Sequence, residues 1–380
     1  MNTVYFDNAA TTKTRKEVVE RYVWCLENLY ANPSSLHKLG FLVEKEIKLA
    51  TKQISEILEV LEEEIFYTSG GTESNNLAIW GCLSRQKKHR HIITTKTEHP
   101  SVFTSIEELS KAGCEVTYLN TDKNGLVDIS EVESLLREDT ALVSIMHVNN
   151  ETGIIQDVDA IGRVVKKSNA VFHVDGVQGF GKIAVDFRNI DMYSFSSHKI
   201  HGVKGVGGLY VKKGSKINPM FFGGGQQKSL RPGTENTAGI MALSCALKLM
   251  YDSISENFKK VLGVKNELLK GLEEIDGVFV NGLVENSSPY ILNLSFVGVK
   301  AEVLLHALEE DNIFVSTGSA CSSKGKGNKN NVLENMGIYR ERYEAALRFS
   351  FCADNTLEEA RKCIESLKKH VRLLRKYSKR

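Results

Sequence analysis

One lysine and one aspartate in this chain have the types and positions of a covalent cofactor site. Lys199 follows the β-rich run 191–195, and a lysine at the end of a buried strand can lose its proton and form a Schiff base. Asp175 closes the apolar run 171–174, where an acid is costly unless a cation accompanies it. A protonated pyridine nitrogen is such a cation, so the pair predicts a pyridoxal phosphate site. Taken singly, Lys199 could be a surface lysine and Asp175 a helix cap.

The segment 66–76 predicts a place for the phosphate. An apolar strand leads into Gly70-Gly71-Thr72 and then into a helix, so free backbone N–H groups and the positive helix end would face an anion. The pattern GxxxxGKS/T is absent from the sequence, and the glycines from 202 to 208 do not fit GxGxxG. The phosphate therefore belongs to something other than a bound nucleotide.

The elements that must position these residues alternate along the chain. Short β-rich runs and helical stretches follow one another, with strands expected at 91–95, 142–147, 171–175 and 191–195 and helices at 43–58 and 157–167. This alternation predicts an α/β fold with a mostly parallel sheet between helices. Functional groups in such sheets gather beyond the carboxyl ends of the strands.

The second part of the chain predicts a smaller α+β lobe. It contains a helix at 257–275, strands near 290–296 and 346–350, and a last helix that opens with a capping box of Thr356 and Glu359 and buries Leu357, Ala360, Ile364, Leu367 and Val371. We expect a large domain at 14–252 and a small domain at 253–380 together with 1–13. The sequence does not decide on which lobe the first dozen residues pack.

Composition excludes several classes of protein. The 380 residues carry 49 basic and 47 acidic side chains, a balance that gives no sign of nucleic-acid binding. No apolar run approaches the roughly 20 residues of a membrane span, and the polar start lacks the apolar core of a signal peptide. Seven cysteines without a CxxC pair argue against disulfides or zinc, and His198 with His201 lacks a third ligand. We expect a cytoplasmic protein without a metal.

Many ordered segments together resemble one known family. The chain is similar to the cysteine desulfurases of the NifS/IscS type, within the fold-type-I pyridoxal-phosphate enzymes, in the blocks 5–12, 32–37, 68–76, 97–100, 148–153, 173–178, 196–199, 231–236, 318–321 and 347–350. The resemblance implies a large domain with a mostly parallel seven-stranded sheet, a smaller α+β C-terminal domain and a homodimer. It also implies removal of sulfur from L-cysteine to give L-alanine.

The resemblance implies a role for each matching residue. Lys199 would hold the cofactor and move the proton at the substrate Cα, and Asp175 would pair with the pyridine nitrogen. Gln178 would contact the ring oxygen, His99 would stack on the ring and take part in proton transfer, and Asn149 would lie near ring and substrate. The phosphate would meet Gly71, Thr72, Ser196 and His198, joined by Thr234 of the partner subunit. Arg348, with Asn32, would hold the substrate carboxylate.

Cys321 is the nucleophile that the resemblance implies. It lies in a polar segment, 316–331, in which Ala320 and Cys321 are the only apolar side chains. Glycines in this segment allow movement, and three lysines favour a thiolate. Without the surrounding motifs, Cys321 could be an incidental cysteine in a surface loop. In the implied reaction it accepts the substrate sulfur as a persulfide and hands it to an acceptor.

Some alternatives stay open from the sequence. A selenocysteine lyase could use the same residues, whereas an aminotransferase of this fold needs no thiol and an idle scaffold would not keep them. The acceptor is either a tRNA-thiolation enzyme or an iron–sulfur scaffold, and the short end after the last helix favours the former. Pro232, where relatives have a small residue, weakens the placement of Thr234. The basic tail 368–380 is expected to be a solvated helix end.

Overall fold

A seven-stranded sheet is the centre of the larger part of the molecule. The computed structural model describes residues 3–84, 90–318 and 331–378. Within these ranges the strand order is β2-β8-β7-β6-β5-β3-β4, with β2 Ile65–Thr68, β3 His91–Thr95, β4 Glu115–Leu119, β5 Thr140–Met146, β6 Val171–Asp175, β7 Met192–Ser196 and β8 Gly207–Val211. Neighbouring strands are parallel except beside β8, which runs antiparallel to β2 and β7. The predicted mostly parallel sheet is confirmed.

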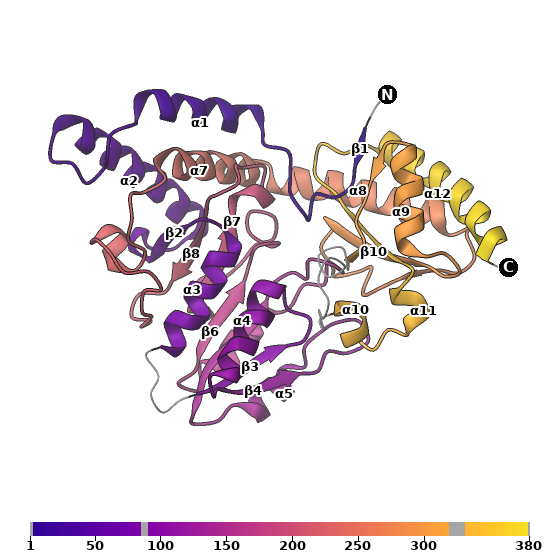
Figure 1. Ribbon diagram of the computed structural model, residues 1–380, viewed down its shortest axis with the longest axis horizontal. Coiled ribbons are helices and arrows are strands. Elements are labelled where there is room, and N and C mark those ends of the chain that lie inside the picture. The colour runs from indigo at the N-terminus through magenta and orange to yellow at the C-terminus, as the bar shows by residue number, and fades with distance from the viewer. Residues whose placement is uncertain (1–2, 85–89, 319–330, 379–380) are drawn as a thin grey trace.

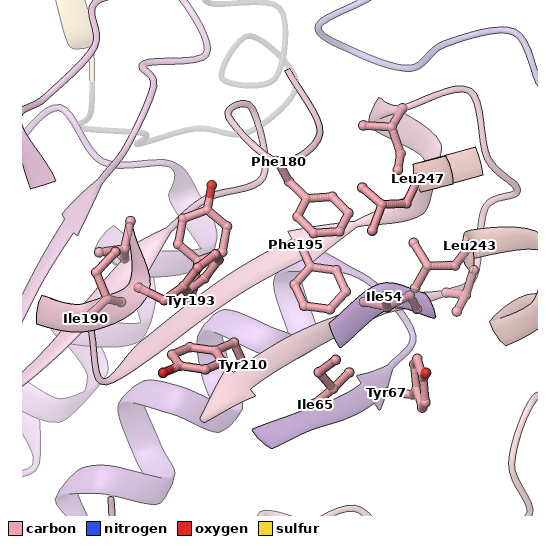
Figure 2. Packing of buried hydrophobic residues seen from close by; sticks show 14 of the residues in the cluster. Ile54, Ile65, Tyr67, Phe180, Ile190, Tyr193, Phe195, Tyr210, Leu243 and Leu247 are labelled. Atoms are coloured by element: carbon pink, nitrogen blue, oxygen red, sulfur yellow. The ribbon is translucent and has the colours of Figure 1, made fainter. Parts of the chain in front are cut away.

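Alternation of side chains along the strands divides the core into two layers. In β7, Tyr193 and Phe195 belong to the core on one face, whereas Met192 belongs to the core on the other. Period-two alternation produces this division because successive strand residues point to opposite faces. Figure 2 shows the first layer, where the rings of Phe180 and Phe195 stack with centroids 4.3 Å apart.

Helices cover both faces, as Figure 1 shows. The core that contains Tyr193 also includes side chains of α1 Lys16–Asn28, α2 Lys38–Leu58, α5 Ile129–Leu135, α6 Val158–Val165 and α7 Thr237–Asp252. The opposite core is covered by α3 Gly71–Leu83 and α4 Pro100–Lys111. The expected helix 43–58 is confirmed but begins earlier, because the side chain of His37 caps its first turn by accepting from the backbone N–H of Gly40.

The C-terminal part has a core and a sheet of its own. Strand β10 Ile291–Phe296 lies between β9 Val278–Val280 and β12 Ala346–Ser350, antiparallel to both. The helices of this part are α8 Ile254–Leu272, α9 Ala301–Glu310, α10 Val332–Asn335, α11 Arg340–Tyr343 and α12 Leu357–Ser378. Its separate apolar cluster supports the domains 14–252 and 253–380 with 1–13, which we retain as a proposal.

The N-terminal segment joins the two parts. Strand β1 Val4–Tyr5 pairs in parallel with β11 Ile313–Phe314, and Phe6 is buried in the C-terminal core. A few residues later the backbone N–H of Thr12 donates to the carbonyl of His198 at 3.0 Å. That carbonyl belongs to η3 Ser197–Lys199, a short 3₁₀ turn directly after β7. The first dozen residues therefore pack on both parts.

The capping box of the last helix is confirmed, with one correction. The backbone N–H of Thr356 donates to Oε2 of Glu359 at 3.0 Å, and the N–H of Glu359 donates to Oγ1 of Thr356 at 3.1 Å. Leu357, however, is 44% exposed, whereas Ala360 and Leu367 are buried as expected. Leu357 is the first residue of the helix, so its side chain lies before the stretch that packs on the core. None of the helices in the described ranges is long and apolar enough to cross a membrane.

Candidate active site

One cavity of about 460 Å³ lies where strands of the large sheet end and the C-terminal part meets them. Its volume is within the range of roughly 300–1,000 Å³ that is typical of small-molecule sites. The sequence-predicted residues on its wall are Gly71, Thr72, His99, Asp175, Gln178, Ser196, His198, Lys199 and Arg348. The structure thus brings nine of the sequence-predicted residues, from distant parts of the chain, to one cavity.

Two glycines shape the turn between β2 and α3. Gly70 has φ 151°, a backbone conformation that residues with a side chain rarely adopt. A Cβ atom added at Gly71 would lie 2.6 Å from Cγ2 of Val177, in the turn after β6. The two turns can therefore approach closely only because residue 71 has no side chain. The start of α3 then presents its N–H groups at the cavity wall, which suits a phosphate.

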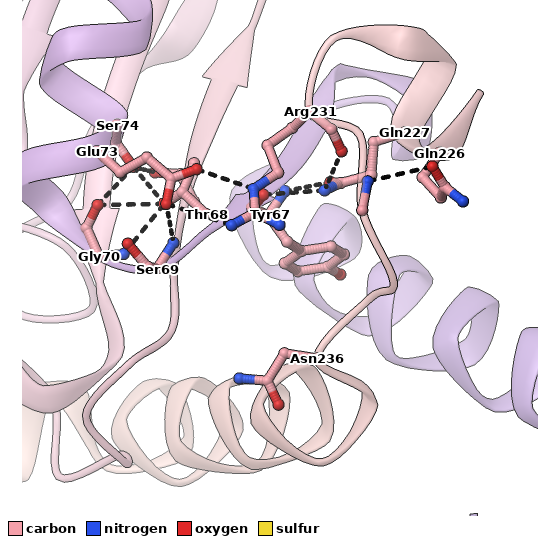
Figure 3. A network of polar contacts seen from close by, with 12 residues as sticks. Tyr67, Thr68, Ser69, Gly70, Glu73, Ser74, Gln226, Gln227, Arg231 and Asn236 are labelled. Carbon is pink, nitrogen blue, oxygen red and sulfur yellow. Dashed lines mark hydrogen bonds and ion pairs between the residues drawn. The ribbon is translucent and has the colours of Figure 1, made fainter. Parts of the chain in front are cut away.

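A polar network ties this turn to the segment before α7, as Figure 3 shows. Glu73, in the first turn of α3, accepts at Oε2 from the backbone N–H of Ser69 at 2.8 Å and pairs at Oε1 with Nε of Arg231 at 2.8 Å. These partners more than offset burial and lower the pKa of Glu73. The side chain of Gln227 donates to the carbonyl of Tyr67 at 2.9 Å. Residues 227–231 are thereby held against the turn between β2 and α3 and the first turn of α3, which together we call the phosphate cradle.

Asp175 at the end of β6 is held at both oxygens. Its Oδ2 accepts from Nδ2 of Asn75 at 2.8 Å and its Oδ1 accepts from the backbone N–H of Val177 at 3.1 Å. The second contact closes the turn after β6, where no helix begins among the described residues, so Asp175 is not a helix cap. The side chain is 95% buried and lines the cavity. An acid held in this way can meet a cationic ring nitrogen without reorienting.

At the cavity wall, Ser196 and Gln178 each present a buried polar atom that has no hydrogen-bond partner in the described part of the chain. Oγ of Ser196 and Oε1 of Gln178 are buried and have no hydrogen-bond partner within the described ranges. Nε2 of Gln178 donates to the carbonyl of Ala9 at 2.9 Å and keeps a second N–H. Because buried polar atoms are rarely unpaired in a finished protein, these two atoms mark places where a bound molecule supplies the missing partners.

Lys199 extends from η3 toward the N-terminal segment. Its Nζ donates to the carbonyl of Ala9 at 2.5 Å and to that of Ala10 at 2.8 Å. Burial, together with the positive charge of Lys199, lowers the pKa of nearby Lys182 to about 7. The same two causes lower the pKa of His198 to about 4. His198 is therefore a neutral hydrogen-bonding group near pH 7.

The two histidines of this turn do not share a ligand-binding position. Nδ1 of His198 lies 3.1 Å from Oγ1 of Thr11, and Nδ1 of His201 lies 2.9 Å from the carbonyl of Lys13. Across the ranges 3–84, 90–318 and 331–378, no group of three or more His, Cys, Asp or Glu residues is arranged to hold a metal ion.

His99 caps α4 and faces the cavity as a neutral ring. Its Nδ1 accepts from the backbone N–H of Ser101 at 3.1 Å and lies 2.8 Å from Oγ of the same serine. Burial lowers the pKa of His99, opposed by the charge of Asp175. Since Nδ1 is an acceptor, the proton of the neutral ring is at Nε2. This tautomer can donate from Nε2 to a ligand.

Arg348 reaches the cavity from β12 of the C-terminal part. Its Nη2 donates to Oδ1 of Asp7 at 2.7 Å and its Nη1 donates to the carbonyl of Asn150 at 3.0 Å. Nε is buried and has no partner among the residues described. One edge of the guanidinium group is thus available for a carboxylate.

Three sequence-predicted residues of the described ranges do not line this cavity. The side chain of Asn149 points into the turn 149–152, where its Oδ1 accepts from the N–H groups of Glu151 and Thr152 at 2.9 and 3.0 Å. The neighbouring residue Asn150 lies on the cavity wall instead. Asn32 is exposed and caps its own loop by accepting from the N–H of Ser34 at 2.9 Å. Thr234 is also exposed. Cys321 lies outside the described residues.

Sequence reasoning missed several wall residues. They are Asp7, Asn75, Glu98, Ser101, Asn150 and Glu151. Burial raises the pKa of Glu98 to about 8 and that of Glu151 to about 7, the latter against the opposing charge of Arg348. The available signal was position, because Glu98 and Asn150 directly adjoin residues that were singled out. Which of two adjacent side chains faces a cavity depends on the turn, which spacing does not reveal.

The fold and this site define a fold-type-I pyridoxal-phosphate enzyme. The chain belongs to the Aminotransferase class-V family, whose model matches residues 4–362. It is 39% identical over 99% of its length to "Cysteine desulfurase IscS" of Clostridium botulinum strain Hall, covering 96% of that protein. The family resemblance inferred from the sequence is confirmed.

Two solved structures show the same fold over nearly the whole chain. One, described as a NifS-like protein, has a TM-score of 0.91 and 37% identity, with 98% of this chain and 99% of the other covered. The second, a NifS-like protein from Rickettsia africae, has a TM-score of 0.87 and 32% identity, with 97% and 99% covered.

The residues on the wall fit pyridoxal phosphate. The glycine turn and the unpaired hydroxyl of Ser196 suit the phosphate, Asp175 suits a pyridinium nitrogen, and Lys199 is an amine within the same cavity. The neutral ring of His99 lies on this wall as well. The fit rests on the unpaired buried atoms and on the absence of a side chain at residue 71.

Proposed function

We propose that this protein is a pyridoxal-phosphate-dependent cysteine desulfurase that converts L-cysteine to L-alanine. The sulfur atom passes to Cys321, which becomes a persulfide. The observation that carries the proposal is the meeting of Lys199, Asp175 and Arg348 in one cavity, since the first two suit the cofactor and the third suits an amino-acid carboxylate. The relatives named cysteine desulfurase over the full chain length support it.

The chain's own residues divide the binding of the cofactor among them. Gly71, Thr72, Ser196 and His198 bind the phosphate, Asp175 binds the ring nitrogen, Gln178 binds the ring oxygen, and Lys199 provides the amine. When bound, pyridoxal phosphate withdraws electrons from the substrate Cα and Cβ. Asp175 keeps the ring nitrogen protonated, which is the state that this chemistry requires.

Substrate binding and proton movement fall to three further groups. Arg348 offers Nε and one N–H of Nη2 to the carboxylate of L-cysteine. The amine of Lys199 would remove the Cα proton, and His99, neutral and protonated at Nε2, would donate or take up a proton within the cavity. The remaining wall is formed by side chains of both parts.

The sulfur step needs one nucleophile. The thiolate of Cys321 bonds to the substrate sulfur as the Cβ–Sγ bond of the substrate breaks, and Cβ takes up a proton to complete L-alanine. Atoms balance without an added oxidant, since L-cysteine and one protein thiol yield L-alanine and one protein persulfide. The persulfide is then available to an acceptor.

We also propose that the enzyme works as a homodimer. Large apolar side chains are exposed on α1, on α2, in the connection between them and in the segment before α7, namely Trp24, Phe41, Tyr30 and Phe222. Large exposed apolar side chains of this kind are typical of an interface. Thr234 is exposed and lies shortly after residues 227–231, the segment that is held against the phosphate cradle. This position suits it to reach the phosphate site of the partner subunit. Light scattering after size exclusion tests the assembly, and a monomer at micromolar concentration contradicts it.

The acceptor and the compartment complete the proposal. A tRNA-thiolation enzyme or an iron–sulfur scaffold protein takes the sulfur, and neither a membrane nor a nucleic acid is bound directly. The six cysteines of the described ranges are all free thiols, which supports the reducing cytoplasm as the place of action.

Mass spectrometry of the purified holoenzyme after anaerobic incubation with L-cysteine tests the reaction. We expect one added sulfur on the peptide with Cys321, alanine in solution, and no added sulfur on the peptide with buried Cys363 as internal control. Unmodified Cys321 without alanine would contradict the proposal. Selenocysteine cleavage or amino transfer by the same fold would then be assayed.

A further inference from the structure

Asp7, an acid to which the sequence analysis gave no role, forms a sheltered ion pair in the cavity. Its Oδ1 accepts from Nη2 of Arg348 at 2.7 Å, and the two side chains are 22% and 9% exposed. Ion pairs at the surface are weakened by water and salt. This pair is largely removed from both, so its charges act strongly on any ligand beside it.

The backbone fixes the position of Asp7. The N–H of Ser350 donates to the carbonyl of Phe6 at 2.7 Å, and the N–H of Asn8 donates to the carbonyl of Ser350 at 3.2 Å. The N-terminal segment is thereby joined to the end of β12, the strand that carries Arg348. Two backbone hydrogen bonds flank Asp7 and hold it beside Arg348. The position of Asp7 is therefore set by the backbone and does not depend on the conformation of a flexible side chain.

The pair changes what the guanidinium group offers. Nη1 donates to the carbonyl of Asn150, Nη2 donates to Asp7, and Nε has no partner in the described part of the chain. Hydrogen-bond donors therefore remain for a carboxylate, but the net charge of the pair is zero. The charge of Arg348 also acts on Glu151, His99 and Tyr5. Burial raises the pKa of Glu151 and so favours its neutral form, whereas Asp7 is the carboxylate that accepts from Nη2 of Arg348.

We propose that Asp7 is a specificity-determining residue that makes the carboxylate site of Arg348 select zwitterionic amino acids over simple carboxylates. A neutral pair with free donors binds a carboxylate by hydrogen bonds without attracting anions in general. Compared with a site that holds Arg348 alone, the neutral pair lowers the affinity for an amino acid of zero net charge only slightly. It lowers the affinity for an anion of the same size more, because that anion is no longer attracted by an uncompensated positive charge. The inference rests on the proposed role of Arg348 as the ligand of the substrate carboxylate.

Binding of two matched ligands to the holoenzyme tests this inference. L-alanine is a zwitterion and 3-mercaptopropionate is an anion at pH 6, and calorimetry gives the dissociation constant of each. In Asp7→Asn the site gains one positive charge, so the affinity for 3-mercaptopropionate relative to L-alanine should rise about tenfold. Glu310→Gln, which removes an exposed acid outside the cavity wall, should leave the ratio unchanged.

Two further variants separate the possible failures. Asp7→Glu keeps the charge and should keep the wild-type ratio, and Asp7→Ser replaces Asp7→Asn if the latter does not fold. Equal changes for both ligands in the neutral variants, or none, would overturn the role of Asp7 as a selector. Arg348→Gln should weaken both ligands. If it weakens neither, the proposed carboxylate site itself is wrong.

Discussion

Nδ2 of Asn75 donates to Oδ2 of Asp175 and to Oγ of Ser101, both at 2.8 Å. Since Oγ of Ser101 lies 2.8 Å from Nδ1 of His99, one amide group links the acid at the end of β6 to the ring that caps α4. Asn75 is 99% buried on the inner face of α3. Asn75 therefore orients both Asp175, which is assigned to the ring nitrogen of the cofactor, and His99, which is assigned to the face of the ring.

Asn75→Ala should weaken cofactor binding about tenfold. The substitution leaves a buried carboxylate with one partner fewer, which costs roughly 1–3 kcal/mol. Fluorescence titration of the apoenzyme with pyridoxal phosphate measures the change. Asn76→Ala on the same helix, whose side chain bonds only to the carbonyl of Thr72, controls for helix propensity. An affinity in Asn75→Ala equal to that of the control contradicts the prediction.

Lys199→Ala should abolish the visible absorption of the bound cofactor. Turnover of L-cysteine should fall by about 10³-fold or more, because both the covalent attachment and the proton transfer depend on this amine. Absorption spectra and alanine release are measured together. Lys204→Ala removes an exposed lysine from the neighbouring loop and should keep both signals. A coloured, active Lys199→Ala protein would refute the cofactor assignment.

Cys321→Ser should keep the cofactor spectrum and its response to L-cysteine but form no persulfide. A hydroxyl group is far less nucleophilic toward sulfur than a thiolate, so the first stages remain and transfer stops. Labelling of persulfides followed by mass spectrometry is the measurement, with Cys245→Ser, a partly buried thiol of α7, as the control. Normal alanine production by Cys321→Ser would remove this residue as the nucleophile.

Gly71→Ala should lower the affinity for pyridoxal phosphate by pushing the cradle away from the turn after β6. The new Cβ would lie 2.6 Å from Cγ2 of Val177, and the turn must shift to relieve the contact. Val177→Ala removes that atom, so the double variant should recover most of the affinity. Gly263→Ala, where nothing lies within 4 Å of the added atom, should bind as the wild type does. Failure of the double variant to recover would show that the clash is not the cause.

Glu98→Gln should stabilise the protein increasingly as pH rises. Burial raises the pKa of Glu98 to about 8 from its ordinary 4.5, so the folded state holds a proton that the unfolded state releases above pH 4.5. The contribution of Glu98 to wild-type stability therefore falls between pH 4.5 and 8, by up to about 3–5 kcal/mol. The neutral amide avoids this loss and keeps an oxygen for the N–H of Met146, which Glu98 accepts at 3.1 Å.

Urea denaturation at pH 5 and pH 8.5 measures that difference. The two proteins should have similar unfolding free energies at the lower pH, and the variant should be the more stable at the higher pH. Glu310→Gln, an exposed acid, is the matched control. An advantage of Glu98→Gln that does not depend on pH would mean that the carboxyl group is not protonated in the folded wild type.

Local pattern determined much of the fold. The strands β3, β6 and β12 occupy the expected residues, because each is a short run of mostly apolar or β-branched residues that is buried on both faces of its sheet. The capping box of Thr356 and Glu359 was equally local. The ordered motifs around Lys199 and Asp175 identified the family, since each motif is read within a few residues.

Tertiary structure alone decided which side chains meet. Asp7 and Arg348 are separated by 341 residues, and no local period reports that the N-terminal segment lies beside β12. Asn150 rather than Asn149 reaches the cavity because a turn rotates one amide inward, and Leu357 is exposed because the helix begins before the core does. Such outcomes depend on how the two cores close on each other, whereas the sequence by itself determined the elements and the chemistry they carry.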